Sequence, residues 1–208
     1  MSDPIDFYFD FSSPYGYFGA ERIDALAQEL GREVRWHAIL LGPMFKATGS
    51  SPTVQVPVKG AYARHDMLRT AELNGIAFRV PEPFPISTVA CARIALYLEA
   101  LDFSIARRFA KRALSAYYVD NVNIGEKSAA LRLAGESGAD SAEVAAAIES
   151  QPLKDRLRAA NDAALARGVF GSPFVIVDDE PFWGFDRFDA MRTWMKRRAS
   201  HADLSSIR

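Results

Sequence analysis

The first 41 residues constrain the fold more than any other part of this sequence. Positions 5–11 read I-D-F-Y-F-D-F, and apolar side chains at alternate positions are typical of a β-strand. Ser12-Ser13-Pro14 then predicts a helix start, because the N–H that proline lacks would be unpaired there anyway. Apolar residues recur at helical spacing until Gly31, and E-V-R-W-H-A-I-L-L at 33–41 predicts a second strand. The opening is therefore β-α-β, with a helix long enough for a parallel crossover.

The rest of the chain is mostly helical and returns to strands near its end. Residues 42–60 are rich in glycine, proline, serine and threonine and predict a long loop, of a length that is usually functional. Two short strands at 174–177 and 180–183 form a hairpin around Asp178-Asp179, and a last helix covers 186–198. Between the loop and the hairpin we expect helices at about 61–74, 87–101, 103–119, 126–137, 140–150 and 152–167.

Removal of the helical block leaves the order β-α-β-β-β-α, which is the connectivity of a thioredoxin fold. The predicted class is therefore α/β, a thioredoxin fold with a large all-helical insertion. Residues 1–40 and 152–208 would form the thioredoxin-like domain, and residues 41–151 the loop and helical insertion domain.

Composition excludes several classes of function. The 208 residues carry 25 basic and 26 acidic side chains, a net charge of −1, so nothing predicts a nucleic-acid or membrane partner. Cys91 is the single cysteine, which rules out an intrachain disulfide, and its apolar helix predicts a small buried residue. With three dispersed histidines, no metal site is expected. No leader and no apolar run near the ~20 residues of a membrane span occur, so we expect a reducing, cytoplasmic location.

The first candidate site is the strand-to-helix junction at Ser13. Redox enzymes of the thioredoxin fold place C-x-x-C here, where the helix dipole stabilises a thiolate. This chain reads Ser13-Pro14-Tyr15-Gly16, so it cannot exchange disulfides itself. The Ser13 hydroxyl can still donate a hydrogen bond to a thiolate that a ligand supplies, although an isolated Ser-Pro is also a common helix cap.

Two further segments would face Ser13 in this topology. Ser172-Pro173 precedes an apolar strand, and a cis-proline there would present the Ser172 backbone to a peptide-like ligand; an ordinary trans turn is the alternative. Asp186 opens the last helix, where it could cap the helix or bind the ammonium group of an amino-acid head group. Trp183 just before it could equally be a core residue. Lys46, in the long loop, is a candidate cation or a solvated lysine, and Lys59 is a second cation there.

Three motifs in this order resemble the 2-hydroxychromene-2-carboxylate isomerase family, which is related to kappa-class glutathione transferases and to DsbA-like proteins. They are F-Y-F-D-F-S-S-P-Y at 7–15, G-V-F-G-S-P-F at 168–174 and F-W-G-F-D-R at 182–187, and the resemblance extends nearly end to end, including K-A-T-G at 46–49.

The resemblance implies glutathione as cofactor, with Ser13 as catalytic residue beside the glutathione sulfur. It implies that Ser172 and Pro173 hold the cysteinyl portion and that Trp183, Gly184, Phe185 and Asp186 hold the γ-glutamyl end. Lys46 would meet the carboxylate of the substrate, a small aromatic acid. Phe185 stands where some members carry a polar side chain, so only its backbone is expected to contribute.

The reaction implied by the resemblance interconverts 2-hydroxychromene-2-carboxylate and trans-o-hydroxybenzylidenepyruvate, a step of aromatic hydrocarbon catabolism. A thiolate would add to the conjugated substrate, the resulting single bond would rotate, and elimination would return the thiolate. A kappa-type glutathione transferase or peroxidase and a non-catalytic thioredoxin-fold binding module are the alternatives. The relatives also imply a homodimer.

Overall fold

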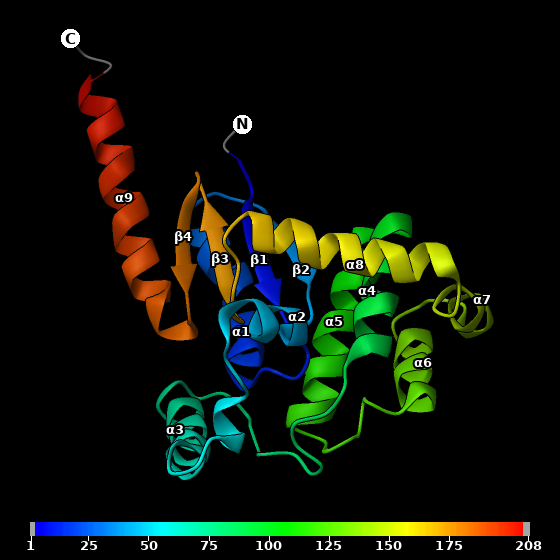
Figure 1. The fold of residues 1–208 in the computed structure, drawn as a ribbon. Helices are drawn as coiled ribbons and strands as arrows, with labels where there is room; N and C mark the ends of the chain where they lie inside the picture. The colour runs from blue at the N-terminus through cyan, green and yellow to red at the C-terminus, as the bar shows by residue number, and fades with distance from the viewer. Residues whose placement is uncertain (1–2, 206–208) are drawn as a thin grey trace.

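The computed structural model describes residues 3–205, and the side chains of residues 3–198. Its centre is a four-stranded mixed sheet in the order β2-β1-β3-β4 (Figure 1). The strands are β1 (Ile5–Phe9), β2 (Val34–Ala38), β3 (Phe174–Val177) and β4 (Glu180–Trp183). β1 pairs with β2 in parallel, whereas β1–β3 and β3–β4 are antiparallel. This is the thioredoxin topology that the sequence predicts.

Helices connect and cover this sheet. In chain order they are α1 (Pro14–Glu29), α2 (Leu41–Thr48), the 3-10 turn η1 (Thr53–Gln55), α3 (Lys59–Leu73), α4 (Val89–Leu101), α5 (Phe103–Tyr118), α6 (Lys127–Glu136), α7 (Ser141–Ala147), α8 (Gln151–Ala166), the 3-10 turn η2 (Phe185–Arg187) and α9 (Phe188–Ser205). The six predicted helices between 61 and 167 and the closing helix are confirmed, with ends that differ by a few residues. None of the helices within the described range is both long enough and apolar enough to cross a membrane.

The long loop predicted at 42–60 is partly wrong, because α2 and η1 form inside it. Gly42 and Pro43 both lie in the first turn of α2. A backbone N–H that is missing there costs no hydrogen bond. Met44 is fully buried, and Gly49 ends the helix in the left-handed conformation with φ 67°.

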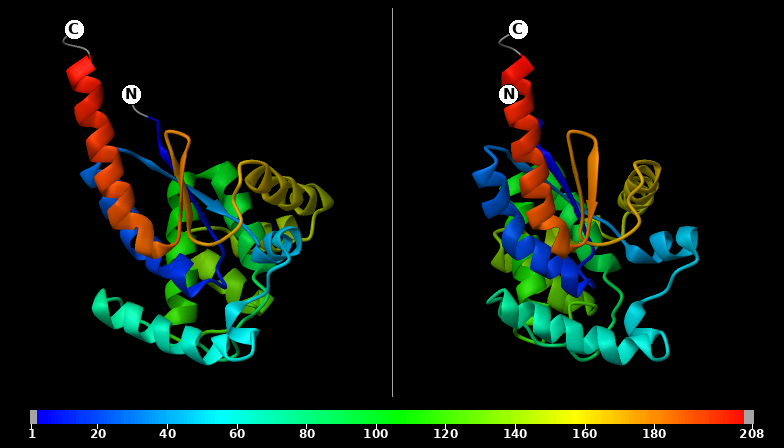
Figure 2. Two further views of the ribbon diagram at one scale, coloured as in Figure 1. Left: turned by 60° about the vertical axis from the view of Figure 1, so that its left-hand side comes forward. Right: turned by 90° about the vertical axis from the view of Figure 1, so that its left-hand side faces the viewer.

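The two faces of the sheet bury different side chains. Ile5, Phe7 and Phe9 belong to the main hydrophobic core, together with residues of α1, α4, α5 and α9. Tyr8 points to the opposite face and packs in a smaller cluster with Met44 of α2 and Ala164 of α8. α3 lies at the bottom of both views in Figure 2, away from the sheet, and contacts η1 and α1.

Candidate active-site cleft

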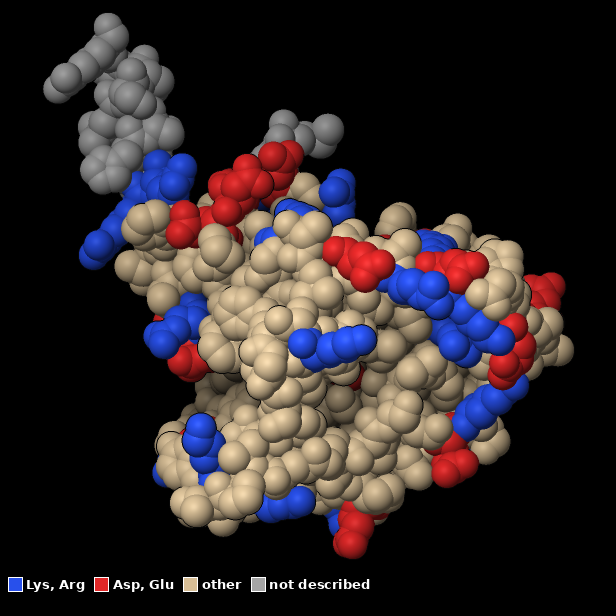
Figure 3. Space-filling view, viewed as in Figure 1, with Lys and Arg blue, Asp and Glu red and all other residues tan. Residues whose placement is uncertain are grey.

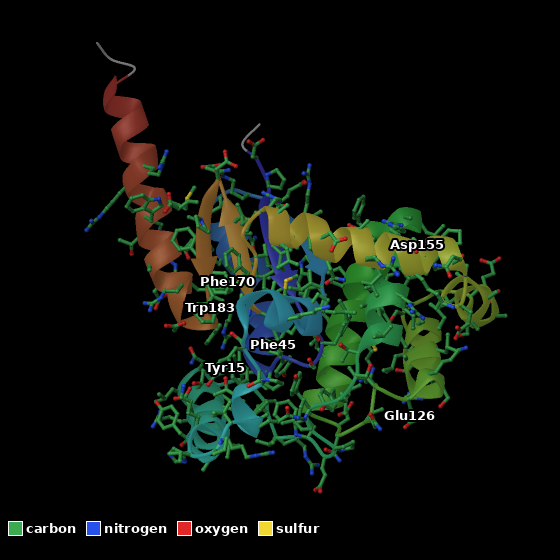
Figure 4. All side chains as sticks on the ribbon, viewed as in Figure 1. Tyr15, Phe45, Glu126, Asp155, Phe170 and Trp183 are labelled. Carbon is green, nitrogen blue, oxygen red and sulfur yellow. The ribbon has the colours of Figure 1, made fainter. Side chains whose placement is uncertain are left out.

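A cleft of about 920 Å³ separates α3 from the thioredoxin core. Figure 3 shows the surface hollowed there, and in Figure 4 the labelled Tyr15, Phe45, Phe170 and Trp183 lie around this region. The side chains on its walls come from the start of α1, from α2 and η1, from α3 and from the segments on either side of the β3–β4 hairpin; they include Ser12, Ser13, Tyr15, Phe45, Lys59, Tyr62, Phe84, Phe170, Ser172, Trp183, Asp186 and Arg187. The cleft wall thus combines aromatic rings with serine and threonine hydroxyls and has few charged groups.

Ser13 caps α1 at the edge of this cleft. Its backbone is extended, with φ −95° and ψ 113°, and its Oγ accepts a hydrogen bond of 3.0 Å from the backbone N–H of Gly16. The same hydroxyl donates to the carbonyl oxygen of Ser172 at 2.8 Å. The side chain is therefore both the helix cap that the sequence predicts and a link to the Ser172-Pro173 segment 159 positions away.

The Ser172-Pro173 bond is cis, one of the two conformations that the sequence left open, and this segment lies directly against α1. A Cβ on Gly16 would lie 2.5 Å from Ser172 Oγ, and a Cβ on Gly19 would lie 3.0 Å from Pro173 Cβ. A side chain at position 16 would therefore force Ser172 to shift, and one at position 19 would be tightly packed. The Ser172 carbonyl accepts the hydrogen bond from Ser13, whereas the Ser172 N–H has no acceptor among the described residues.

Asp10 organises the junction, and sequence analysis missed it. The side chain is almost completely buried, and its carboxylate accepts hydrogen bonds from Ser12 N–H and Oγ, from Thr88 Oγ1 and from Leu41 N–H at 2.6–2.9 Å. Asp10 N–H also donates to Ser172 Oγ at 2.9 Å. The signal in the sequence was an acidic residue between two phenylalanines immediately before Ser12-Ser13.

The β4–α9 side of the cleft carries exposed groups suited to a polar ligand. Trp183 is 56% exposed and contacts Phe170 edge to face, with ring centroids 4.8 Å apart. It is therefore a wall of the cleft rather than a core residue. Asp186 lies in η2 with its side chain 71% exposed and 3.5 Å from the Arg187 guanidinium. Gly184, and not Asp186, occupies the cap position of this turn, which leaves the Asp186 carboxylate open to the cleft.

The two candidate lysines have different positions. Lys46 lies in the last turn of α2, exposed, and outside the set of side chains that line the cleft, although its neighbour Phe45 belongs to that set. Lys59 is the first residue of α3 and does line the cleft. The geometry brings Ser13, Ser172, Trp183 and Asp186 together around one space and places Lys46 beside it.

A second polar contact joins α1 to α3 across the cleft. The Tyr15 hydroxyl donates a hydrogen bond to Asp66, and Arg69 pairs with the same carboxylate. The hydrogen bond from Tyr15, reinforced by Arg69, lowers the pKa of Asp66, although partial burial opposes the shift. Burial and the nearby Asp66 carboxylate raise the pKa of Tyr15. Sequence analysis did not pair these residues, which are 51 positions apart.

The single cysteine does not line this cleft. Cys91 is fully buried in α4, as predicted, and desolvation raises the pKa of its thiol. Within residues 3–198 no three histidine, cysteine or acidic side chains gather as a metal site would require.

Known proteins resemble this chain over most of its length. Residues 4–196 match the model of the DsbA-like thioredoxin domain family. The chain is 29% identical to a 2-hydroxychromene-2-carboxylate isomerase of Pseudomonas putida, over 97% of this chain and 99% of that protein. It is 27% identical to glutathione S-transferase kappa 2 of Caenorhabditis elegans, over 84% of this chain and 81% of that protein. A solved structure of a 2-hydroxychromene-2-carboxylate isomerase superposes with a TM-score of 0.83 at 28% identity, covering 96% of this chain and 98% of the other. The chain belongs to the DsbA-like thioredoxin domain family and, within it, to the 2-hydroxychromene-2-carboxylate isomerase family.

Proposed function

We propose that this protein is a glutathione-dependent isomerase that interconverts 2-hydroxychromene-2-carboxylate and trans-o-hydroxybenzylidenepyruvate. The observation that carries the proposal is the Ser13 hydroxyl, held at the N-terminus of α1 on the wall of an aromatic cleft of about 920 Å³. A cleft of this size is within the range of small-molecule sites. The end-to-end similarity to isomerases of that name supports the choice of reaction.

The residues around the cleft fit glutathione. The unpaired Ser172 N–H, next to a cis-proline, suits the backbone of the cysteinyl portion. The exposed Asp186 carboxylate, whose partner Arg187 is also exposed, suits an ammonium group, and the Trp183-Gly184-Phe185 backbone borders the same end of the cleft. The family resemblance implies that Lys46, at the end of α2, binds the substrate carboxylate.

Bound glutathione would supply the thiolate that adds to the conjugated substrate and is eliminated after bond rotation. Ser13 favours the charged form of that thiol by turning its hydroxyl hydrogen away from Ser172, while its oxygen still accepts from Gly16. The Tyr15 backbone N–H, which has no acceptor among the described residues, and the α1 dipole act in the same direction. Thr88 and Ser12 hold Asp10, which in turn positions Ser172 through its own N–H.

A kappa-type glutathione transferase is the second candidate function, supported by the similarity to the nematode kappa enzyme over most of both chains. Both activities need the same bound thiolate. They differ in whether the sulfur adduct is eliminated or kept.

The deciding experiment incubates the protein with 2-hydroxychromene-2-carboxylate, with and without glutathione. Isomerisation that requires glutathione but does not consume it supports the isomerase. Consumption of glutathione with formation of a stable adduct supports the transferase. Calorimetry that detects no glutathione binding at millimolar concentration would exclude both and leave a non-catalytic binding module. The homodimer and the cytoplasmic location expected from the sequence stay predictions, which sedimentation and cell fractionation test.

A further inference from the structure

The backbone just before α3 has an uncommon conformation. Val58 has φ 67° and ψ −50°, and the N–H of Lys59 donates to the carbonyl of Pro57 at 2.8 Å. These values describe a classic γ-turn, which is rare and strained, and a β-branched residue is among the least suited to it. The Val58 side chain is 93% exposed, so no burial of this side chain offsets the strain.

Contacts on both sides hold this turn in place. The N–H of Gly60 donates to the carbonyl of Val56 at 2.9 Å, and a Cβ on Gly60 would lie 2.5 Å from the carbonyl oxygen of Val54. η1 and the first turn of α3 therefore fit together only with glycine at position 60. Strain of this kind persists where the surrounding structure fixes it, often at ligand sites. Lys59, which directly follows the turn, lines the cleft.

The charge of Lys59 is unfavourable for α3 itself. A cation in the first turn opposes the helix dipole, and no acidic residue in that turn compensates. Among the described residues Lys59 forms no ion pair, whereas Asp186 and Arg187, the other charged side chains on the cleft wall, pair with each other. The α3 side of the cleft thus presents an unpaired positive charge and a positive helix end, bordered by hydroxyls of Ser50, Ser51 and Thr53.

We propose that Lys59 binds a carboxylate of the ligand in the cleft. This inference rests on the proposed function, which supplies two carboxylates that could reach the α3 side: that of the aromatic substrate and the glycyl carboxylate of glutathione. Both have the chemistry that an ammonium group at a helix start recognises. Lys59 is then a specificity-determining residue that selects acids over neutral ligands of the same shape.

Two pairs of probes test the proposal and separate the two sources. The first pair is trans-2-hydroxycinnamate and its methyl ester, and the second is glutathione and its glycyl monoethyl ester. Calorimetry measures the Kd of each for the wild-type protein, for Lys59→Met, for Lys59→Arg and for the matched control Lys127→Met, which removes an exposed lysine at the first position of α6, outside the cleft.

We expect the wild-type protein to bind the acid about tenfold more tightly than the ester in at least one pair. Lys59→Met should abolish that preference, Lys59→Arg should restore most of it, and Lys127→Met should leave it unchanged. The pair that responds identifies the source of the carboxylate. A wild-type protein without any preference, or a Lys59→Met variant that keeps it in both pairs, overturns the proposal. The two proposals can also fail separately. If Lys59→Met loses the preference but the wild-type protein does not isomerise the chromene, the proposed function is overturned and the Lys59 assignment stands.

Discussion

Ser13 connects the helix cap, the cis-proline segment and the cleft through one hydroxyl group. Its oxygen accepts from Gly16 and its hydrogen is donated to Ser172. Rotation about the Cβ–Oγ bond can redirect the hydrogen to a ligand sulfur without loss of the cap. The cost of the switch is therefore one hydrogen bond to a carbonyl, replaced by a stronger one to a charged acceptor.

Ser13→Ala should lower the rate of isomerisation by about tenfold to a hundredfold, the equivalent of one hydrogen bond to a charged group. The pKa of the bound glutathione thiol should rise, because the thiolate loses a donor. Ultraviolet absorbance of the thiolate during a pH titration measures this change. Thr48→Ala is the matched control, since the Thr48 hydroxyl on the cleft wall already donates to the Met44 carbonyl. Equal rates and equal thiol pKa values in Ser13→Ala and the wild-type protein would remove Ser13 from the mechanism.

Gly16 lets the Ser172 segment approach α1, and a larger residue there should be destabilising. A Cβ at this position would lie 2.5 Å from Ser172 Oγ, so we expect Gly16→Ala to lower the free energy of unfolding by about 1–3 kcal/mol. Ser172→Ala removes the clashing oxygen. Because its hydrogen bond from the Asp10 N–H is lost, this variant should lower the free energy of unfolding by about 1 kcal/mol.

A double-mutant cycle in urea isolates this contact. Because the clash disappears, the double variant should be more stable than the sum of the two single effects predicts. Gly42→Ala is the control for the substitution itself, since a Cβ there meets nothing within 4 Å. Strict additivity of the two single variants would contradict the steric explanation.

Two tyrosine hydrogen bonds tie α1 to α3 and to the segment after α3, and they differ in their dependence on pH. Tyr15 donates to the Asp66 carboxylate, and this bond is the main cause of the lowered pKa of Asp66. A lowered pKa in the folded state contributes stability that is present above the unfolded value, about 3.9, and is lost as the pH falls through the folded value. Tyr17, also in α1, donates to the carbonyl of Ala77 at 2.8 Å, and a carbonyl does not titrate in this range.

The difference in stability between the wild-type protein and Tyr15→Phe should therefore be largest near neutral pH and shrink below about pH 4. Tyr17→Phe should cost a nearly constant amount over the same range. Urea unfolding at a series of pH values measures both. A penalty for Tyr15→Phe that stays constant down to pH 3 would argue against the link between Tyr15 and the Asp66 charge.

The regular elements could be predicted from the sequence because each rests on local patterns. The alternation at Ile5–Phe9 and the Ser-Pro start of α1 were sufficient to place the strand and the helix. α2 was missed because glycine and proline in a first helical turn resemble a loop. Contacts between distant residues, such as Asp10 with Thr88, depend on packing that no local pattern records. The clustering of Ser13, Ser172 and Asp186 was predictable only because the topology was recognised first.

The two predicted domains share one hydrophobic core. The Tyr118 hydroxyl of α5 donates to the carbonyl of Phe11 at 3.2 Å, and the Tyr17 and Tyr118 rings stack with centroids 5.1 Å apart. Phe11 also contacts Phe109 at 5.9 Å between ring centroids. The main cluster of buried residues thus includes the sheet, α1 and α9 together with α4, α5 and α6 of the insertion. Removing the insertion would expose the aromatic face of the sheet to water.

This shared core predicts that the protein unfolds in a single cooperative transition, although chains of this length often unfold in stages. The three tryptophans, Trp36, Trp183 and Trp194, all lie in the thioredoxin-like segments, whereas much of the helix lies in the insertion. Tryptophan fluorescence and far-ultraviolet circular dichroism therefore report on different segments of one chain. We expect their urea midpoints and slopes to coincide, because neither segment can keep its core without the other. A helical signal that disappears before the fluorescence changes would show instead that residues 41–151 unfold independently.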